Sequence, residues 1–132
     1  MFKKISVHTN NQVDFINITG EIKKFISSEK VSDGLITIFV PHTTAGITIN
    51  EQADPDVITD IDNALGKIIP SGWKFLHIEG NSPAHIKASV MGSSVQIIIE
   101  KGIPLLGTWQ GVFFCEFDGP RRREAWFKII PG

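Results

Sequence analysis

Short apolar runs, each bounded by glycine, proline or a polar turn, constrain the fold of this chain most. The run from Val13 to Ile18 alternates apolar and polar residues, and the run from Leu35 to Val40 is rich in β-branched residues. Both patterns are typical of strands. Strands are predicted at residues 13–18, 35–40, 47–51, 95–100, 103–106, 110–117 and 125–130. We expect the last two to form a terminal hairpin around Asp118-Gly119-Pro120.

Three segments carry helix signals. Asp54 followed by Pro55 places a capping carboxylate before a proline at the first helical position. Ser82 and Pro83 repeat this signal and open a second short helix, which we expect to run to about Met91. Thr19 can cap another short helix. The buried faces are predicted to hold Ile22, Phe25 and Ile26 in the helix after Thr19, and Val57, Ile58, Ile61, Leu65, Ile68 and Ile69 in the helix after Asp54.

Strands thus dominate, with two or three helices inserted among them, so the predicted class is α+β. We expect a compact β-rich single domain over residues 1–132, built as a mixed sheet or sandwich with these helices inserted. The chain of 132 residues has the typical length of a single domain. No linker, repeat or low-complexity tract divides it.

Charge and cysteine content narrow the functional classes. The net charge of −1 provides no field that would attract nucleic acid or an anionic membrane. The single cysteine, Cys115, excludes an internal disulfide, and its apolar neighbours predict a buried, unreactive thiol. Residues 1–6 lack the apolar core of a signal peptide, and no apolar run approaches the length of a membrane span. We expect a soluble, cytoplasmic protein.

The segment from His77 to His85 is the most informative for function, because it places two histidines, an acid and an amide around a glycine turn. His85 lies near the positive end of the predicted helix, which favours the neutral imidazole that can bind a metal. His42, in a threonine-rich turn, can complete a three-histidine set. We predict a polar site with His42, His77 and His85 as ligands of a divalent metal (Mg or Zn). The alternative is that His85 only helps to cap its helix.

Two further groups contain candidate site residues. Asn50 and Glu51 end a predicted strand, where oxygen ligands suit magnesium; the nearby Asp54 is more readily explained as a helix cap. In the run Arg121-Arg122-Arg123, the planar guanidinium groups suit phosphate. Three consecutive arginines of a strand cannot all face one way, because side chains alternate. The alternative for this run is a solvated turn.

Five segments, taken together, resemble the signature of the YjbQ-like family. They are His42-Thr43-Thr44-Ala45-Gly46, Asn50-Glu51, Asn81 with Ala84-His85, Gly107-Thr108-Trp109-Gln110-Gly111 and Glu116-Phe117-Asp118-Gly119-Pro120-Arg121. The resemblance implies a compact β-rich α+β fold, assembled as a homotrimer with sites near subunit boundaries. It also implies a thiamine-phosphate synthase activity, which joins a hydroxymethylpyrimidine diphosphate to a thiazole phosphate and releases pyrophosphate.

The resulting site hypothesis assigns roles by residue. His42, Glu51 and His85 are predicted to be catalytic. Residues predicted to bind a small phosphorylated substrate are Thr44, Asn50, Asn81, Trp109, Gln110, Arg121 and Arg122. Two other functions stay open: a metal-dependent hydrolase or lyase acting on a phosphorylated metabolite, and a non-catalytic trimeric protein that binds a ligand or a partner.

Overall fold

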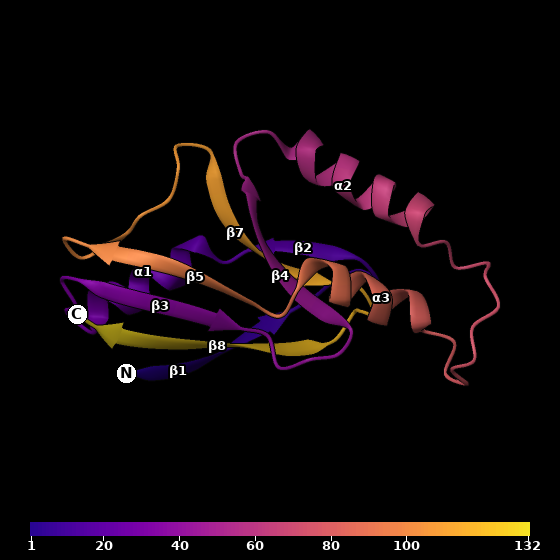
Figure 1. Cartoon of the computed structure of the whole chain (residues 1–132), viewed down its shortest axis with the longest axis horizontal. Coiled ribbons are helices and arrows are strands. Elements are labelled where there is room, and N and C mark those ends of the chain that lie inside the picture. Colours follow the sequence, from indigo (N-terminus) through magenta and orange to yellow (C-terminus); the bar gives the residue numbers. More distant parts are fainter.

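Two antiparallel sheets and three helices make up the fold (Figure 1). The computed structural model describes residues 1–132. Its elements are β1 (Phe2–His8), β2 (Asp14–Asn17), α1 (Thr19–Ser28), β3 (Gly34–Phe39), β4 (Ala45–Glu51), α2 (Pro55–Ile68), α3 (Ser82–Met91), β5 (Ser94–Glu100), β6 (Ile103–Pro104), β7 (Gln110–Glu116) and β8 (Arg122–Pro131). The predicted α+β class is confirmed. The N-terminal strand β1 is an element that the sequence patterns did not reveal.

The larger sheet has the strand order β1-β8-β3-β5-β6, and the smaller has the order β2-β7-β4. In the larger sheet Ile36 pairs with Ile97 of β5 and with Ile129 of β8. These three side chains are buried on one face, because residues in register on neighbouring strands point to the same side. They form part of a hydrophobic core of 19 buried residues that also includes Ile47 and Phe114 from the smaller sheet.

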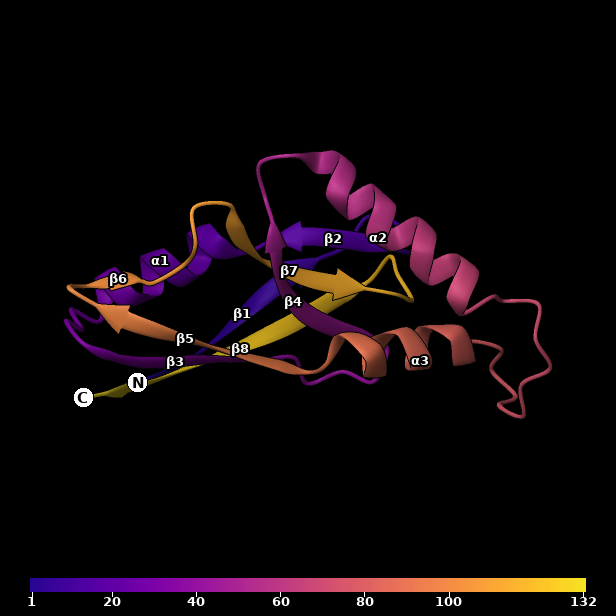
Figure 2. The ribbon, with the colours of Figure 1, turned by 45° about the horizontal axis from the view of Figure 1, so that its top comes forward.

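Helices α2 and α3 lie beyond the smaller sheet (Figure 2). A second core cluster on this side unites Leu65 of α2 and Ala88 of α3 with Phe113, Cys115 and Phe117. Strand β7 therefore contributes alternate side chains to two cores, one on each face of its sheet. The predicted burial of Cys115 is confirmed, and burial raises the pKa of its thiol to about 12.

Helix α3 packs closely on β4, and this contact positions the C-terminal end of the helix. A side chain at Gly46 would meet the backbone oxygen of Gly92 at 2.8 Å. The backbone N–H of Ile47 donates to that same oxygen at 3.0 Å. Glycine at position 46 therefore permits the approach that anchors the end of α3 against the smaller sheet.

The predicted terminal hairpin is wrong. β7 and β8 follow each other in the chain, but β7 pairs with β2 and β4, whereas β8 pairs with β1 and β3. The segment between them carries the chain from one sheet to the other. The local apolar pattern is the same for a hairpin and for two strands in different sheets, so it could not distinguish them.

The helix signals were correct for α2 and only partly so for the others. The side chain of Asp54 accepts a hydrogen bond from the backbone N–H of Asp56 at 2.9 Å, as a cap should. Thr19, by contrast, caps nothing, because its hydroxyl oxygen accepts the N–H of Val112. In the predicted apolar face of α2, Leu65 is buried, but Ile68 is two-thirds exposed. No helix of the structure combines the length and the apolar character needed to cross a membrane.

Candidate functional site

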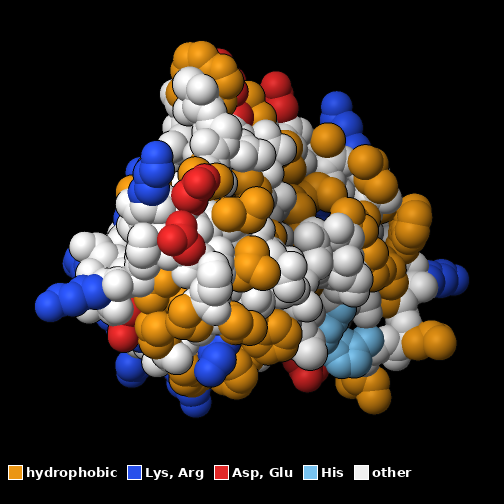
Figure 3. Space-filling model, turned by 60° about the vertical axis from the view of Figure 1, so that its left-hand side comes forward, with side chains coloured by type: hydrophobic (Ala, Val, Ile, Leu, Met, Phe, Trp, Pro, Cys, Tyr) orange, Lys and Arg blue, Asp and Glu red, His pale blue; other side chains and the backbone are white.

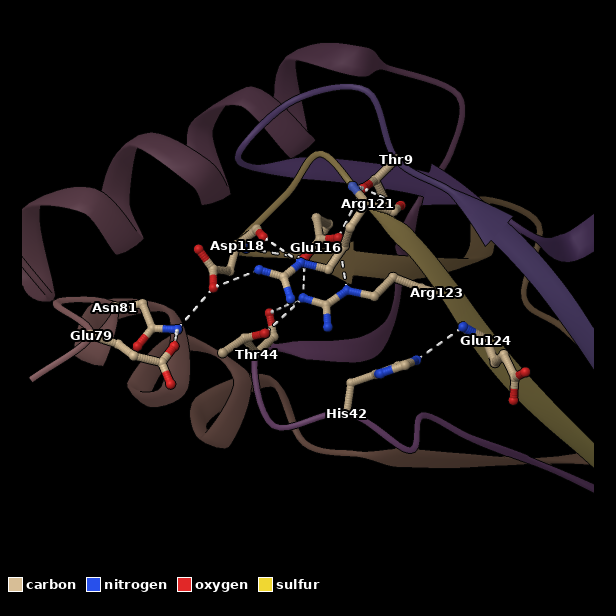
Figure 4. A network of polar contacts seen from close by, with 10 residues as sticks. All are labelled: Thr9, His42, Thr44, Glu79, Asn81, Glu116, Asp118, Arg121, Arg123 and Glu124. Atoms are coloured by element: carbon tan, nitrogen blue, oxygen red, sulfur yellow. Dashed lines mark hydrogen bonds and ion pairs between the residues drawn. The ribbon is translucent and has the colours of Figure 1, made fainter. Parts of the chain in front are cut away.

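Three segments that are distant in the sequence line one polar cavity of about 340 Å³. They are the connection between β3 and β4, the stretch that leads into α3 together with the first turn of that helix, and the crossover between β7 and β8 together with the start of β8 (Figure 4). None of the lining residues is hydrophobic. The lining consists of Pro41, His42, Thr43, Thr44, His77, Glu79, Asn81, His85, Asp118, Arg121 and Arg123. We call this space the histidine cavity.

A buried ion pair between Glu116 and Arg123 lies behind the cavity. The Nε of Arg123 donates to Oε1 of Glu116 at 2.8 Å, and Nη2 donates to Oε2. Nη2 also donates to the hydroxyl oxygen of Thr44 at 2.7 Å. Figure 4 shows the third nitrogen, Nη1, turned away from Glu116. Arg123 is thus fixed on one side, while this nitrogen makes no hydrogen bond within the chain.

Glu116 is fully buried, and its carboxylate is satisfied by several donors. Burial by itself raises the pKa of the carboxyl group. Hydrogen bonds from Arg123, from the backbone N–H of Asp118 and from the hydroxyl of Thr9 outweigh that effect, so the pKa is lowered overall. The group is therefore ionised at neutral pH and holds the guanidinium in place.

A second arginine, Arg121, is aligned by Asp118 at the mouth of the cavity. Its Nε donates to the backbone oxygen of Asp118 at 2.9 Å, and its Nη2 donates to Oδ2 of the same residue at 3.0 Å. The amide nitrogen of Asn81 donates to that Oδ2 at 2.9 Å. Arg121 is half exposed, so this ion pair adds at most about 1 kcal/mol to stability. Its main effect is to orient the guanidinium.

His42 is held as a neutral imidazole. Its Nε2 accepts the backbone N–H of Glu124 at 2.9 Å, so the ring proton is on Nδ1. Burial and the neighbouring charge of Arg123 both lower the pKa of His42, and these effects exceed the opposing charges of Glu116 and Glu124. His42 therefore offers an N–H donor to any ligand that its Nδ1 can reach.

His77 and His85 lie beside each other, with ring centroids 5.2 Å apart and planes almost perpendicular. The structure thus brings together all three histidines that the sequence singled out. They do not form a metal site in this arrangement, because no group of three or more His, Cys, Asp or Glu side chains is positioned to hold an ion. The lone pair of His42 Nε2 is already used by Glu124. The metal ligand set stays a prediction.

Other predicted site residues lie far from the histidine cavity within the chain. Asn50 and Glu51 end β4, whose first residue follows the cavity's Thr44. At a rise of about 3.3 Å per residue, seven residues put roughly 20 Å between the ends of this strand. Gln110 pairs with Glu51, so it lies at the same distant end, where the neighbouring Trp109 is exposed.

The three consecutive arginines do not all point the same way, because side chains alternate along a strand. Arg121 and Arg123 line the cavity, but Arg122 does not; its Nη2 donates to Ser6 of β1 at 3.2 Å. Thr44, Asn81 and Arg121 were predicted to bind substrate, and they do line the cavity. The sequence reasoning missed Glu116 and Arg123. Residue spacing could have indicated Arg123, because it lies two positions from Arg121 on the same side of the chain.

Comparison with known proteins identifies the family. The family model described as "UPF0047 protein YjbQ-like" matches residues 3–132. The chain belongs to this family. The predicted resemblance to YjbQ-like proteins is therefore confirmed.

Two relatives from the YjbQ-like family match over almost their whole length. UPF0047 protein MJ1081 of Methanocaldococcus jannaschii is 58% identical, over 98% of this chain and 94% of the relative. UPF0047 protein YugU of Bacillus subtilis is 44% identical, over 98% and 99% of the two chains. A crystal structure of a YjbQ/UPF0047 protein from Clostridium acetobutylicum has a TM-score of 0.95 at 57% identity, and the match covers 97% of this chain and 99% of that one.

Proposed function

We propose that this protein is a small-molecule enzyme that binds a phosphorylated substrate in the histidine cavity. The observation that carries the proposal is the convergence of two arginines and three histidines on a space without hydrophobic lining. Its volume of about 340 Å³ falls in the usual range for small-ligand sites. Planar guanidinium groups suit phosphate oxygens, and both arginines are held in place by carboxylates.

The cavity residues suggest separate tasks in this proposal. Arg123 Nη1 and the Nδ1–H of His42 are donors without a partner in the chain, and they would bind phosphate oxygens from the buried side. Arg121, half exposed at the mouth, would bind them from the solvent side. His77 and His85 would transfer protons, since imidazole is the side chain that most often does so near neutral pH.

The reaction implied by the family resemblance is a thiamine-phosphate synthase-type transfer. The bond between the pyrimidine methylene carbon and the diphosphate oxygen breaks, and the oxygen keeps the electron pair. A new bond forms between that carbon and the thiazole nitrogen. In this proposal Arg121 and Arg123 stabilise the charge on the departing pyrophosphate, and His85 gives it a proton.

Hydrolysis of a phosphorylated metabolite is the second candidate, since a wholly polar cavity can also hold the water that attacks the substrate. A divalent metal stays a prediction for either reaction. Because Nε2 of His42 accepts the backbone N–H of Glu124, His77 and His85 are the imidazoles available to bind the metal. Elemental analysis of protein purified without an affinity tag tests the metal directly.

The predicted homotrimer is supported by an apolar stripe on the outer face of the larger sheet. Leu35 lies in register with Ile98 and Ile130, and all three are exposed. Figure 3 shows hydrophobic side chains in several patches on one side of the molecule, with histidine at one edge. Contiguous exposed apolar surface marks sites of association. Sedimentation of a Leu35→Lys variant should show a smaller assembly than the parent protein.

Turnover of the two thiamine precursors, followed by pyrophosphate release, tests the proposed function. His85→Ala should abolish turnover, whereas His8→Ala should leave it unchanged, because His8 lies on β1 and does not line the cavity. Circular dichroism of both variants checks that they are folded. If His85→Ala turns over like the parent protein, His85 has no role in the reaction. Release of inorganic phosphate from one precursor alone would support the hydrolase instead.

A further inference from the structure

A separate cavity of about 410 Å³ is formed where the end of α1 meets the turn between β5 and β6. Figure 2 shows α1 and β6 together at one end of the molecule, with α3 at the other. The lining consists of Ile26, Ser27, Lys30, Val31, Ser32, Lys101 and Gly102. We call this space the lysine cavity. It shares no residue with the histidine cavity.

Both lysines of this cavity have a left-handed backbone, which is unfavourable for residues that carry a Cβ. The φ angle is 56° at Lys30 and 53° at Lys101, and no other residue except glycine has a positive φ. Lys30 directly follows the C-cap of α1, a position where glycine is common. Lys101 and Gly102 form the two-residue turn between β5 and β6, where Asn-Gly is preferred. Local structure therefore favours other residues in place of both lysines.

Backbone hydrogen bonds hold the two turns beside each other. The N–H of Gly102 donates to the backbone oxygen of Ser32 at 2.9 Å, and the N–H of Lys30 donates to the backbone oxygen of Ser27 at 3.2 Å. The two lysines, although distant in the sequence, are therefore brought to one cavity by the path of the backbone.

The ammonium groups have no counter-charge within the chain, because neither lysine forms an ion pair. Three acids, Glu29, Asp33 and Glu100, are close to the lysines in the sequence, but none of them lines the cavity or forms an ion pair. The end of a helix favours a cation, which accounts for a positive charge at Lys30 but not at Lys101. Two unpaired positive charges thus meet at one concave surface.

The lining indicates the class of ligand. Two ammonium groups supply two positive charges, and the hydroxyl groups of Ser27 and Ser32 are further donors. A phosphate group suits this set, because at neutral pH it carries nearly two negative charges and has several acceptor oxygens. The apolar lining residues Ile26 and Val31 are buried, so they offer little surface to an apolar ligand.

We infer that the lysine cavity binds the phosphate group of a small, soluble phosphate ester through Lys30 and Lys101. The unfavourable backbone of both residues is then explained, because it directs two positive charges to one site. The inference does not depend on the proposed function, since the two cavities have no residue in common.

Titrations with inorganic phosphate and with glycerol 3-phosphate, followed by amide NMR, test the inference. Both ligands should shift the amide resonances of Lys30, Ser32 and Gly102 until the shifts saturate. Absence of saturation, or the same shifts with sodium chloride at equal ionic strength, would overturn the inference. Cosedimentation of the protein with vesicles that contain phosphatidate, lost when both lysines are replaced, would assign the site to a lipid head group instead of a soluble ester.

The double variant Lys30→Gly/Lys101→Asn separates binding from folding. Glycine suits the position after the helix and Asn-Gly suits the turn, so the urea midpoint should be higher than in the parent protein. Both phosphate ligands should bind at least about tenfold more weakly, because two charged donors are lost. Lys24→Ala removes a charge of α1 outside the cavity and should bind phosphate like the parent protein. Unchanged affinity in the double variant, or equal weakening in Lys24→Ala, would contradict the inference.

Arg121→Ala distinguishes this site from the histidine cavity. It should weaken the shifts that phosphate causes at His77 and His85, and leave those at Lys30 and Gly102 unchanged. If phosphate shifts only the histidine amides, the inference fails and the proposed function stands. If phosphate shifts only the amides of the lysine cavity, the inference stands and the proposed function fails.

Discussion

Arg123 of β8 and Glu116 of β7 form a buried ion pair across the corner where the chain passes from one sheet to the other. The pair links fold and site, because the same guanidinium that satisfies Glu116 also lines the histidine cavity. The crossover between the two strands, which replaces the expected hairpin, is what lets these side chains meet.

Removing one partner of this pair should destabilise the protein strongly. In Glu116→Gln the buried guanidinium loses its counter-charge, and we expect the free energy of unfolding to fall by about 3–5 kcal/mol. Urea unfolding measures the change. The double variant Glu116→Gln/Arg123→Met should recover part of the loss, because no unpaired charge remains buried. A double variant that loses the sum of both single effects would contradict this account.

The lowered pKa of Glu116 also predicts how stability depends on pH. A carboxyl group with a lower pKa in the folded state stabilises the fold above its unfolded pKa, which is near 4.3. That contribution is lost as the pH falls through the folded value. Urea unfolding between pH 3 and pH 7 should therefore show a steeper loss below about pH 4.3 in the parent protein than in Glu116→Gln. Parallel curves would show that Glu116 does not titrate differently in the folded state.

His42 should be a neutral ring with its proton on Nδ1. Long-range nitrogen–proton NMR distinguishes the tautomers, and the resonance of Nε2 should be that of an acceptor. Protonation should occur below the ordinary value near 6.5, so the stability that depends on the neutral ring is full above that pH and declines as the pH falls through the lower folded pKa. Observation of Nε2–H near neutral pH would contradict the hydrogen bond from Glu124.

Local sequence patterns were sufficient for most elements of this fold. Alternation identified β2, β-branched residues identified β3, and Asp54 before Pro55 marked the start of α2, because these signals depend on neighbouring residues alone. They could not show that β7 and β8 enter different sheets, since pairing is decided by contacts between distant segments. For the same reason Glu116 gave no local sign that it would be buried opposite Arg123.

The residue types of the candidate site could be predicted from the sequence. Which individual residues line the cavity could be predicted less well. Three histidines were expected to meet, and they line one cavity. Glu51 was predicted to be catalytic with His42 and His85 because it ends a strand and belongs to a family motif, but the extended strand β4 carries it away from the cavity. Arg122 was chosen over Arg123, although strand alternation places Arg123 with Arg121.

Gly66→Ala should stabilise the protein by about 0.5–1 kcal/mol, because alanine is the better helix former and its Cβ meets no atom. Urea unfolding monitored by far-ultraviolet circular dichroism measures the difference. The prediction is independent of any ligand. A destabilised variant would mean that the space beside Gly66 is not open in solution.

Binding of inorganic pyrophosphate, measured by titration calorimetry, tests most directly whether the histidine cavity is an anion site. Arg121 lines the cavity and Arg122, its neighbour, does not, so the two alanine variants remove equal charge from adjacent positions. Arg121→Ala should weaken pyrophosphate roughly 10- to 100-fold through the loss of charge-assisted hydrogen bonds, and Arg122→Ala should bind like the parent protein. Equal weakening in both variants, or none in Arg121→Ala, would contradict the account.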